Sequence, residues 1–270
     1  MLRDMARKES ISIIMPAYNE EKRIGSTLKL YSEYLEKMRK KEKFEYEILV
    51  VINNTKDKTE DVVKTWRKKN KRINYINLVK GGKGYAVIEG FKNALKRGFD
   101  FIGFVDADAA TPPEAYHLLI KNINGYDGSI ASRYVKGSAI YPRRSFVRTI
   151  VGRTFNYIVR ALFMMNYKDT QCGAKLFRRK TLEKIIPNLG LTNWAFDVEL
   201  LYECSKNGFQ IKEEKTKWKE VDGSKVDINK TSLQMLSAVL QLRILKSKFK
   251  HSLKIISPGV SLLYKLIGGK

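Results

Sequence analysis

Cysteine, histidine and long apolar runs are scarce in this chain of 270 residues, and each scarcity excludes a class of protein. The two cysteines, Cys172 and Cys204, form no CxxC pair, which argues against a disulfide framework or a zinc site and favours reduced thiols. His117 and His251 have no partner pattern and are interpreted as structural or surface residues. Because no run of about 18 uncharged apolar residues occurs, no transmembrane helix is expected. The first ten residues do not resemble a signal peptide.

Acidic residues are also few. The chain has 52 Lys and Arg against 28 Asp and Glu, which gives a net charge of +24. Residues 128–168 and 228–270 contain no acid and eight basic residues each. We expect these two segments to face anionic partners such as phosphorylated substrates, an acidic membrane surface or nucleic acid. Because 43% of the residues are apolar, a packed core is expected and wholesale disorder is excluded.

Apolar strands and charged, periodic helices alternate through the first 125 residues. Strands are predicted at 10–15, 46–52, 73–79 and 99–105, and helices at 20–43, 58–70, 84–97 and from Pro112. This alternation predicts a mostly parallel, helix-covered α/β sheet, in which ligands bind beyond the carboxyl ends of the strands. In the less regular second half, strands are predicted at 128–132, 174–178 and 208–213, and helices at 145–165, 196–205 and 232–250.

Two carboxylates one residue apart, Asp106 and Asp108, directly follow the fourth predicted strand. Carboxylates in this position can share Mg²⁺ or Mn²⁺ with a diphosphate, because hard cations prefer oxygen ligands. A solvated turn can carry the same residues, so the pattern alone leaves both interpretations open. The loops PAYNEE and NNTKDKT follow the first and second strands and are expected at the same rim of the sheet.

Further segments resemble inverting glycosyltransferases of the GT-A fold. The sequence MPAYNE at 15–20 resembles the opening motif of that family, and DAD followed by Pro112-Pro113 lies about 90 residues later, as it does there. The segments GGKGYAV (81–87), DTQCGAKLF (169–177), WAFDVEL (194–200) and WKEVDGSK (218–225) are similar to those of dolichyl-phosphate glucose synthases and, more loosely, dolichyl-phosphate mannose synthases. The resemblance spans residues 10 to about 245.

This resemblance implies metal-dependent transfer of a hexose from a nucleotide diphosphate sugar to a polyprenyl (dolichyl-type) monophosphate. It implies Asp106 and Asp108 as catalytic metal ligands, and it places Asp197 where related transferases have a catalytic base. A helix N-cap is the alternative role for Asp197. The implied nucleotide-sugar pocket contains Pro16, Ala17, Tyr18, Asn19, Glu20, Asn53, Lys83, Asp106, Ala107 and Asp108. The implied acceptor-phosphate ligands are Arg133, Arg143, Arg144 and Arg148, whose guanidinium groups suit a phosphate dianion.

One motif departs from the family, which usually has Asp-Asp-Gly-Ser after the second strand, where this chain has Asn53-Asn54-Thr55. An amide donates and accepts, whereas a carboxylate only accepts, so the identity of the base stays open. Glucose from UDP-glucose is favoured over mannose from GDP-mannose. A polysaccharide or protein acceptor is also compatible with the fold. A basic nucleic-acid-binding module would explain the net charge, but the basic residues are not interleaved with an RNA-binding motif.

We predict a GT-A domain at 1–228, with an interfacial helix at about 145–167, and a basic amphipathic membrane-associating segment at 229–270. One apolar stripe comprises Val151, Phe155, Ile158, Leu162 and Met165, and the other comprises Leu233, Leu236, Leu240 and Ile244. Acid-free amphipathic helices of this kind suit an anionic lipid surface. Packing of both stripes on the domain core would produce the same pattern. The expected location is cytoplasmic, peripheral to the cytoplasmic face of a membrane.

Overall fold

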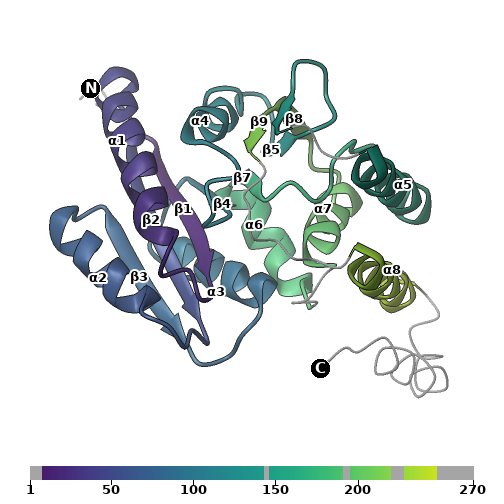
Figure 1. Cartoon of the computed structure of the whole chain (residues 1–270). Helices are drawn as coiled ribbons and strands as arrows, with labels where there is room; N and C mark the ends of the chain where they lie inside the picture. Colours follow the sequence, from purple (N-terminus) through teal and green to yellow (C-terminus); the bar gives the residue numbers. More distant parts are fainter. Residues whose placement is uncertain (1–7, 143–145, 191–194, 220–227, 248–270) are drawn as a thin grey trace, which may run out of the picture.

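A seven-stranded sheet in the order β3-β2-β1-β4-β7-β5-β8 forms the centre of the computed structural model, which describes residues 8–142, 146–190, 195–219 and 228–247 (Figure 1). Its strands are β1 (Ser10–Ala17), β2 (Glu45–Asn53), β3 (Ile73–Leu78), β4 (Phe101–Val105), β5 (Gly128–Ser132), β7 (Ala174–Arg178) and β8 (Ile211–Lys215). Only β7 runs antiparallel to its neighbours, β4 and β5. The predicted mostly parallel sheet is therefore confirmed.

Strands β1 and β2 are almost wholly buried because helices cover both faces of the sheet. Their sequences, SISIIMPA and EYEILVVIN, are nearly continuous apolar runs, as expected for parallel strands without a solvent face. Ile13 of β1 lies opposite Ile48 of β2 and Gly103 of β4. This register brings the carboxyl ends of β1, β2 and β4 to one rim.

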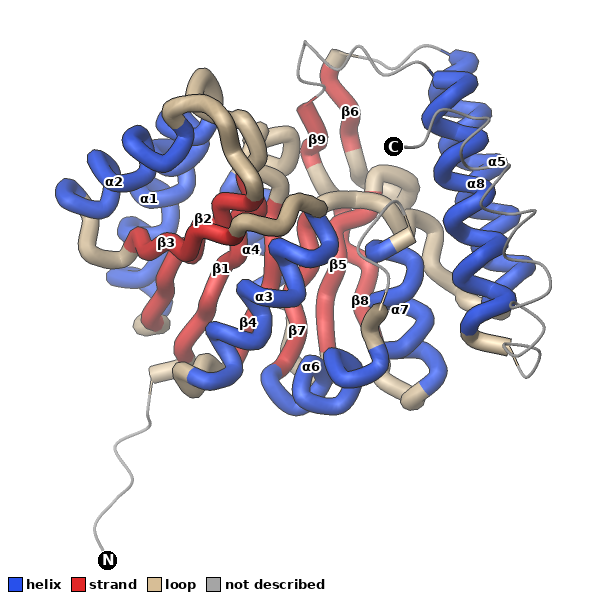
Figure 2. Tube along the Cα trace, turned by 90° about the horizontal axis from the view of Figure 1, so that it is seen from below, coloured by secondary structure: helices blue, strands red, loops and turns tan. Residues whose placement is uncertain are grey.

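Seven of the helices that accompany the sheet are α1 (Ile24–Glu42), α2 (Thr59–Lys69), α3 (Lys83–Lys96), α4 (Pro113–Lys121), α6 (Arg179–Ile185), η1 (Ile186–Asn188) and α7 (Phe196–Lys206). Side chains of α1, α2 and α4 share one apolar cluster with the sheet, and side chains of α3, α6 and α7 share a second. Figures 1 and 2 show the sheet between these two helical layers. His117 is structural, as predicted, because its ring contacts Glu42 at 2.8 Å and Tyr34 at 3.1 Å.

Beyond β8, α5 (Phe146–Phe163) packs against α8 (Ile228–Leu245), and the two lie side by side in Figure 2. Phe155 and Met165 of the first predicted stripe are buried in a cluster with α7 and α8, and Leu162 packs against it. Three of the five stripe side chains, Phe155, Leu162 and Met165, are therefore covered by protein, as in the alternative in which the stripe packs on the core. The interfacial position of the helix stays a prediction. The predicted stripe of α8 is not the side that packs on the core. Leu233 and Leu240 of that stripe are exposed, whereas Val239 and Leu242, which lie outside it, are buried.

Several short elements were not predicted. Strand β6 (Ala139–Tyr141) pairs in parallel with β9 (Lys217–Lys219), and α6 follows β7 without a loop. Because α8 joins the cluster of α5 and α7, the first part of the predicted C-terminal segment packs on the core. Its membrane association stays a prediction, and residues 248–270, with His251, lie outside the described residues. Among the helices described, none combines the length and apolarity needed to cross a bilayer.

Candidate active site

A cleft of about 800 Å³ lies at the rim where β1, β2 and β4 end. It is lined by Pro16, Tyr18, Glu20, Arg23, Asn53, Asn54, Gly81, Gly82, Lys83, Asp106, Ala107 and Asp108. Most of the predicted nucleotide-sugar pocket is therefore brought together. Ala17 is buried at the end of β1, and Asn19 does not line the cleft but ties two loops together.

The PAYNEE loop is fixed by hydrogen bonds to the loop after β2. Asn19 accepts from the Lys56 N–H at 2.9 Å through its side-chain oxygen. The N–H of Glu20 donates to the Thr59 hydroxyl at 2.7 Å. Glu20 in turn receives two bonds from Arg23, at 2.7 and 2.8 Å. These bonds hold one wall of the cleft, while Tyr18 projects half-exposed beside it.

The amide of Asn53 explains the departure from the family motif. Its nitrogen donates to the Ala17 carbonyl at 3.0 Å, and its oxygen accepts from the Gly82 N–H at 3.1 Å. A carboxylate could not donate the first of these bonds. Asn53 is 3% exposed, so its amide joins the end of β1 to the glycine turn. Its contact with a nucleoside stays a prediction.

Lys83 begins α3 directly after the glycine turn, where Gly82 has a φ of 124°. The N-terminal N–H groups of a helix favour anions, so this turn can receive a phosphate. The Lys83 ammonium lies 2.5 Å from Asp106 Oδ1. Desolvation alone lowers the pKa of Lys83, but the charges of Asp106 and Asp197 outweigh it and raise that pKa, so Lys83 is protonated at neutral pH.

Asp106 and Asp108 follow β4, as predicted, and Thr27 fixes their loop by donating to the Ala107 carbonyl at 2.7 Å. Desolvation raises the pKa of Asp106, and the negative charges of Asp108 and Asp197 add to the rise against the attraction of Lys83. Asp108 accepts from the Ala110 N–H at 2.9 Å. Among the described residues, no cation lies within ion-pair distance of Asp108.

This arrangement fits a divalent cation. Among the residues that the structure describes, no three His, Cys, Asp or Glu side chains form a metal-binding group. Asp106 and Asp108 therefore supply two carboxylates, and the remaining positions fall to diphosphate oxygens and water, which hard cations accept. The unneutralised charge of Asp108 and the raised pKa of Asp106 are both relieved by a bound cation.

Residues of the segment DTQCGAKLF position the carboxylates of Asp106 and Asp197. This role was not predicted from the sequence. A Cβ at Gly173 would occupy the space of the Asp106 carboxylate, so only glycine leaves room for it. Lys175, 1% exposed on β7, donates to the Cys172 carbonyl at 2.7 Å and to Asp197 at 2.6 Å. A lysine inside an apolar strand, two residues after a glycine, was the one signal in the sequence.

Asp197 is not the N-cap of its helix, which corrects one of the two roles considered for it. Ala195 occupies the N-cap position of α7, and Asp197 lies in the first turn of the helix. Its carboxylate is held by Lys175 and lies close enough to Lys83 and Asp106 to affect the pKa of both. Asp197 therefore belongs to the same charged cluster as the DAD motif, and its catalytic role stays a prediction.

Arg133 lies in a buried ion pair rather than an open basic surface. Its Nε and Nη2 donate to the two oxygens of Asp169 at 2.7 and 2.8 Å. The side chains of Arg133 and Asp169 are 9% and 0% exposed. Two of the five guanidinium N–H groups are thus used by Asp169. Binding of an acceptor phosphate by Arg133 stays a prediction. Arg148 lies in the first turn of α5, and Arg143, Arg144 and Trp194 lie outside the described residues.

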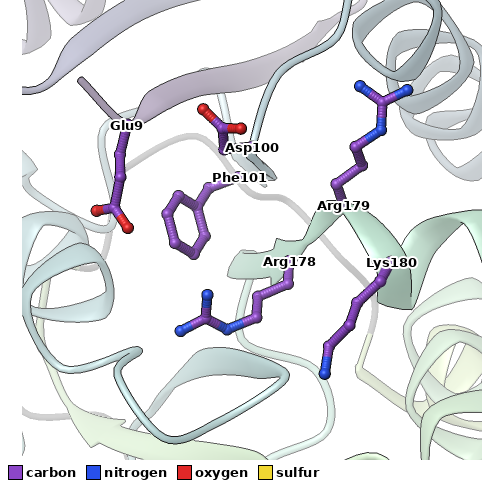
Figure 3. Close-up of a pocket in the computed structure, with 6 residues that line it drawn as sticks. All are labelled: Glu9, Asp100, Phe101, Arg178, Arg179 and Lys180. Atoms are coloured by element: carbon purple, nitrogen blue, oxygen red, sulfur yellow. The ribbon is translucent and has the colours of Figure 1, made fainter. Parts of the chain in front are cut away.

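A second cavity, of about 510 Å³, lies at the opposite edge of the sheet, where β4 begins and β7 ends (Figure 3). Its walls are Glu9, Asp100, Phe101, Arg178, Arg179 and Lys180. Its cations are engaged: Arg178 donates to the Tyr126 carbonyl at 2.7 Å, and Arg179 and Lys180 pair with Glu183 and Asp127. None of the predicted site residues lines it, so the rim cleft is the candidate active site.

Replacing Gly173 with alanine is expected to displace the Asp106 carboxylate and lower the transfer rate roughly 10²-fold, the effect of misplacing a reacting group by about 1 Å. Gly190→Ala is the control, because a Cβ there meets nothing within 4 Å. Equal behaviour of the two variants would contradict the fit described for Gly173.

Comparisons with known proteins identify the family of this chain. The model of glycosyl transferase family 2 matches residues 12–186. Dolichyl-phosphate beta-glucosyltransferase of Dictyostelium discoideum is 38% identical over 245 residues, which cover 86% of this chain and 73% of the relative. The human protein of the same name is 34% identical, with 87% and 75% covered.

Solved structures show the same fold. Glucosyl-3-phosphoglycerate synthase from Mycobacterium tuberculosis in complex with UDP superposes with a TM-score of 0.65 at 16% identity, covering 89% of this chain and 82% of that one. Its complex with Mn²⁺, UDP and glucosyl-3-phosphoglycerate gives 0.65 at 18% identity, covering 87% and 80%. The predicted GT-A fold is confirmed. The chain is a glycosyltransferase of glycosyl transferase family 2, and it is related to the dolichyl-phosphate beta-glucosyltransferases.

Proposed function

We propose that this glycosyltransferase transfers glucose from UDP-glucose to dolichyl or a related polyprenyl monophosphate, with inversion, at the cytoplasmic surface of a membrane. The observation that carries the proposal is the rim cleft, where Asp106, Asp108 and Lys83 meet below the PAYNEE loop. The names of the relatives support the lipid phosphate acceptor and the glucose. The neighbouring structures, which hold UDP with Mn²⁺ or Mg²⁺, support the donor and the metal.

In this mechanism, the turn at Gly82 and the start of α3 receive the diphosphate, and the protonated Lys83 adds a positive charge beside it. Asp106 and Asp108 would hold Mg²⁺ or Mn²⁺, which would stabilise the negative charge that develops on the departing diphosphate. Lys175 keeps Asp197 oriented toward the sugar. An oxygen of the acceptor phosphate attacks the anomeric carbon opposite the diphosphate. Because a phosphate monoester has a second pKa of about 6, the attacking oxygen is ionised at neutral pH without a base.

A donor and acceptor screen tests the proposal. The purified full chain in detergent, with Mn²⁺ or Mg²⁺, is incubated with UDP-glucose, UDP-galactose, GDP-glucose or GDP-mannose. The acceptors are polyprenyl phosphate, the corresponding polyprenol and 3-phosphoglycerate. We expect a lipid-linked glucose only with UDP-glucose and polyprenyl phosphate. Transfer from GDP-mannose would overturn the sugar and the base, and transfer to 3-phosphoglycerate in preference to the lipid would overturn the acceptor.

A further inference from the structure

One face of α5 presents basic and large apolar side chains to the outside. Ile150, Tyr157 and Met164 are 47%, 65% and 90% exposed. Arg153 and Arg160 alternate with them at spacings of three and four residues, which place all five on one side of a helix. The opposite side of α5 packs on α7 and α8, so this outward face has no covering element among the described residues.

A cavity of about 250 Å³ opens beside this face. It is lined by Tyr134, Arg153, Asn156, Tyr157, Arg160 and Lys168, none of which lines the rim cleft. Three of these side chains are cationic. Among the residues that the structure describes, no carboxylate lies within ion-pair distance of Arg153, Arg160 or Lys168.

The polar groups near the cavity do not neutralise it. Arg160 donates to the neutral amide oxygen of Asn166 at 2.9 Å, and the Arg153 guanidinium lies 5.8 Å from the Tyr134 ring centroid. Two acidic residues, Asp169 and Glu213, lie near Lys168, and neither pairs with a cation of the cavity. Asp169 pairs with Arg133. Glu213 accepts the backbone N–H groups of Lys168 and Asp169.

One further group is unsatisfied. The Tyr134 hydroxyl is buried and has no hydrogen-bond partner among the described residues. It lies close above Gly152 of α5, where an added Cβ would approach it to 2.8 Å. The cavity itself presents three cations without a counter-charge, a set of groups that suits an anion with several oxygens.

We propose that this cavity binds the phosphate of an anionic membrane lipid and so fixes α5 at the bilayer surface. Guanidinium and ammonium groups match the phosphate oxygens. Tyr157, Met164 and Ile150 surround the cations with side chains that suit the boundary between headgroups and acyl chains, which favours a lipid over free phosphate. None of its lining residues lines the rim cleft, so the site is separate from the residues assigned to the nucleotide sugar and the metal.

Vesicle co-sedimentation of the full chain tests the site. Phosphatidylcholine vesicles with and without phosphatidic acid are used, free of dolichyl phosphate and nucleotide sugar, so the result does not depend on the proposed reaction. The variant Arg153→Gln/Arg160→Gln/Lys168→Gln is expected to bind the anionic vesicles about 10²-fold more weakly, since each basic residue at such a surface contributes a factor of about five.

The control is Lys29→Gln/Lys37→Gln/Lys41→Gln on α1, which removes the same charge from the side of the molecule away from α5 (Figure 1). We expect it to lose less than about threefold, because charges farther from the surface than a Debye length are screened. Unfolding curves of both variants verify their folding. Should the triple variant not fold, the exposed Lys168→Gln alone should still weaken binding about fivefold.

Two further arms separate a lipid from a free anion. Tyr157→Ser/Met164→Ser should weaken vesicle binding several-fold and leave the binding of inorganic phosphate, measured by calorimetry, unchanged. Equal vesicle binding by the α5 and α1 triple variants would overturn the proposal. So would vesicle binding that ignores Tyr157 and Met164 while inorganic phosphate binds tightly in the cavity, because that result identifies a site for a soluble anion.

Discussion

Asp108→Asn is expected to lower the glucose transfer rate about 10³-fold, equivalent to roughly 4 kcal/mol of transition-state stabilisation. Asparagine keeps the oxygen that accepts from the Ala110 N–H, so the loop after β4 should stay in place. What is lost is the carboxylate without a cationic partner, the group best placed to hold a metal beside the diphosphate. Initial rates of lipid-linked glucose formation, with circular dichroism to verify folding, measure the effect.

Glu114→Gln is the matched control, because it removes a carboxylate from an exposed position on α4 outside the cleft. It should change the rate less than twofold, whereas excess chelator should reduce the wild-type rate as strongly as Asp108→Asn does. Full activity in chelator, or an Asp108→Asn rate within tenfold of the wild type, would remove the metal from the mechanism.

The same metal effect should depend on pH. Because the pKa of Asp106 is raised, the folded protein holds this proton more tightly than the unfolded chain does. The ionised carboxylate therefore costs stability above that pKa, and a bound cation offsets the cost. The gain in unfolding temperature from Mn²⁺ with UDP should be largest at neutral pH and should shrink as the pH falls toward the pKa of Asp106.

Asp169→Asn is expected to lower the free energy of unfolding by about 3–5 kcal/mol, because it leaves the Arg133 guanidinium buried without its counter-charge. Urea unfolding followed by circular dichroism measures the change. Adding Arg133→Met to Asp169→Asn should recover part of the loss, since the double variant no longer buries an unpaired charge.

Glu183→Gln provides the comparison with an exposed pair. Its partner Arg179 is 40% exposed, so the change in unfolding free energy should stay below about 1 kcal/mol. One outcome for Asp169→Asn would instead support the prediction that Arg133 binds the acceptor phosphate. If Asp169→Asn leaves stability unchanged and alters only the KM for polyprenyl phosphate, Arg133 is an acceptor ligand and its pairing with Asp169 is secondary.

The first half of the fold was predictable because its signals are local. The boundaries of β1, β2, β3, α2 and α3 lie within two residues of their predicted positions, where apolar runs end at Pro, Gly or charged residues. The pair β6 and β9 has no such signal. Each strand has three residues, and Ala139 pairs with Lys217, 78 positions along the chain. A pairing of this kind depends on tertiary contacts alone.

The candidate site divides in the same way. Asp106, Asp108 and the PAYNEE loop were found from their places after predicted strands, since parallel strands bring their carboxyl ends to one rim. Gly173 and Lys175 were not found, although their motif was recognised. Gly173 directly precedes β7, and Lys175 lies on it. Strand β7 is inserted between β4 and β5 and runs antiparallel to both, and nothing in the sequence predicts this insertion.

The sequence by itself determined the order of the motifs, the rim at which they meet and the family to which the chain belongs. It also determined that α5 is amphipathic, because a repeat of three and four residues requires one apolar face. Only the tertiary structure decided what covers that face. The same stripe can pack on lipid or on protein, and here α7 and α8 cover Phe155 and Met165, which turns Arg153, Tyr157 and Met164 outward.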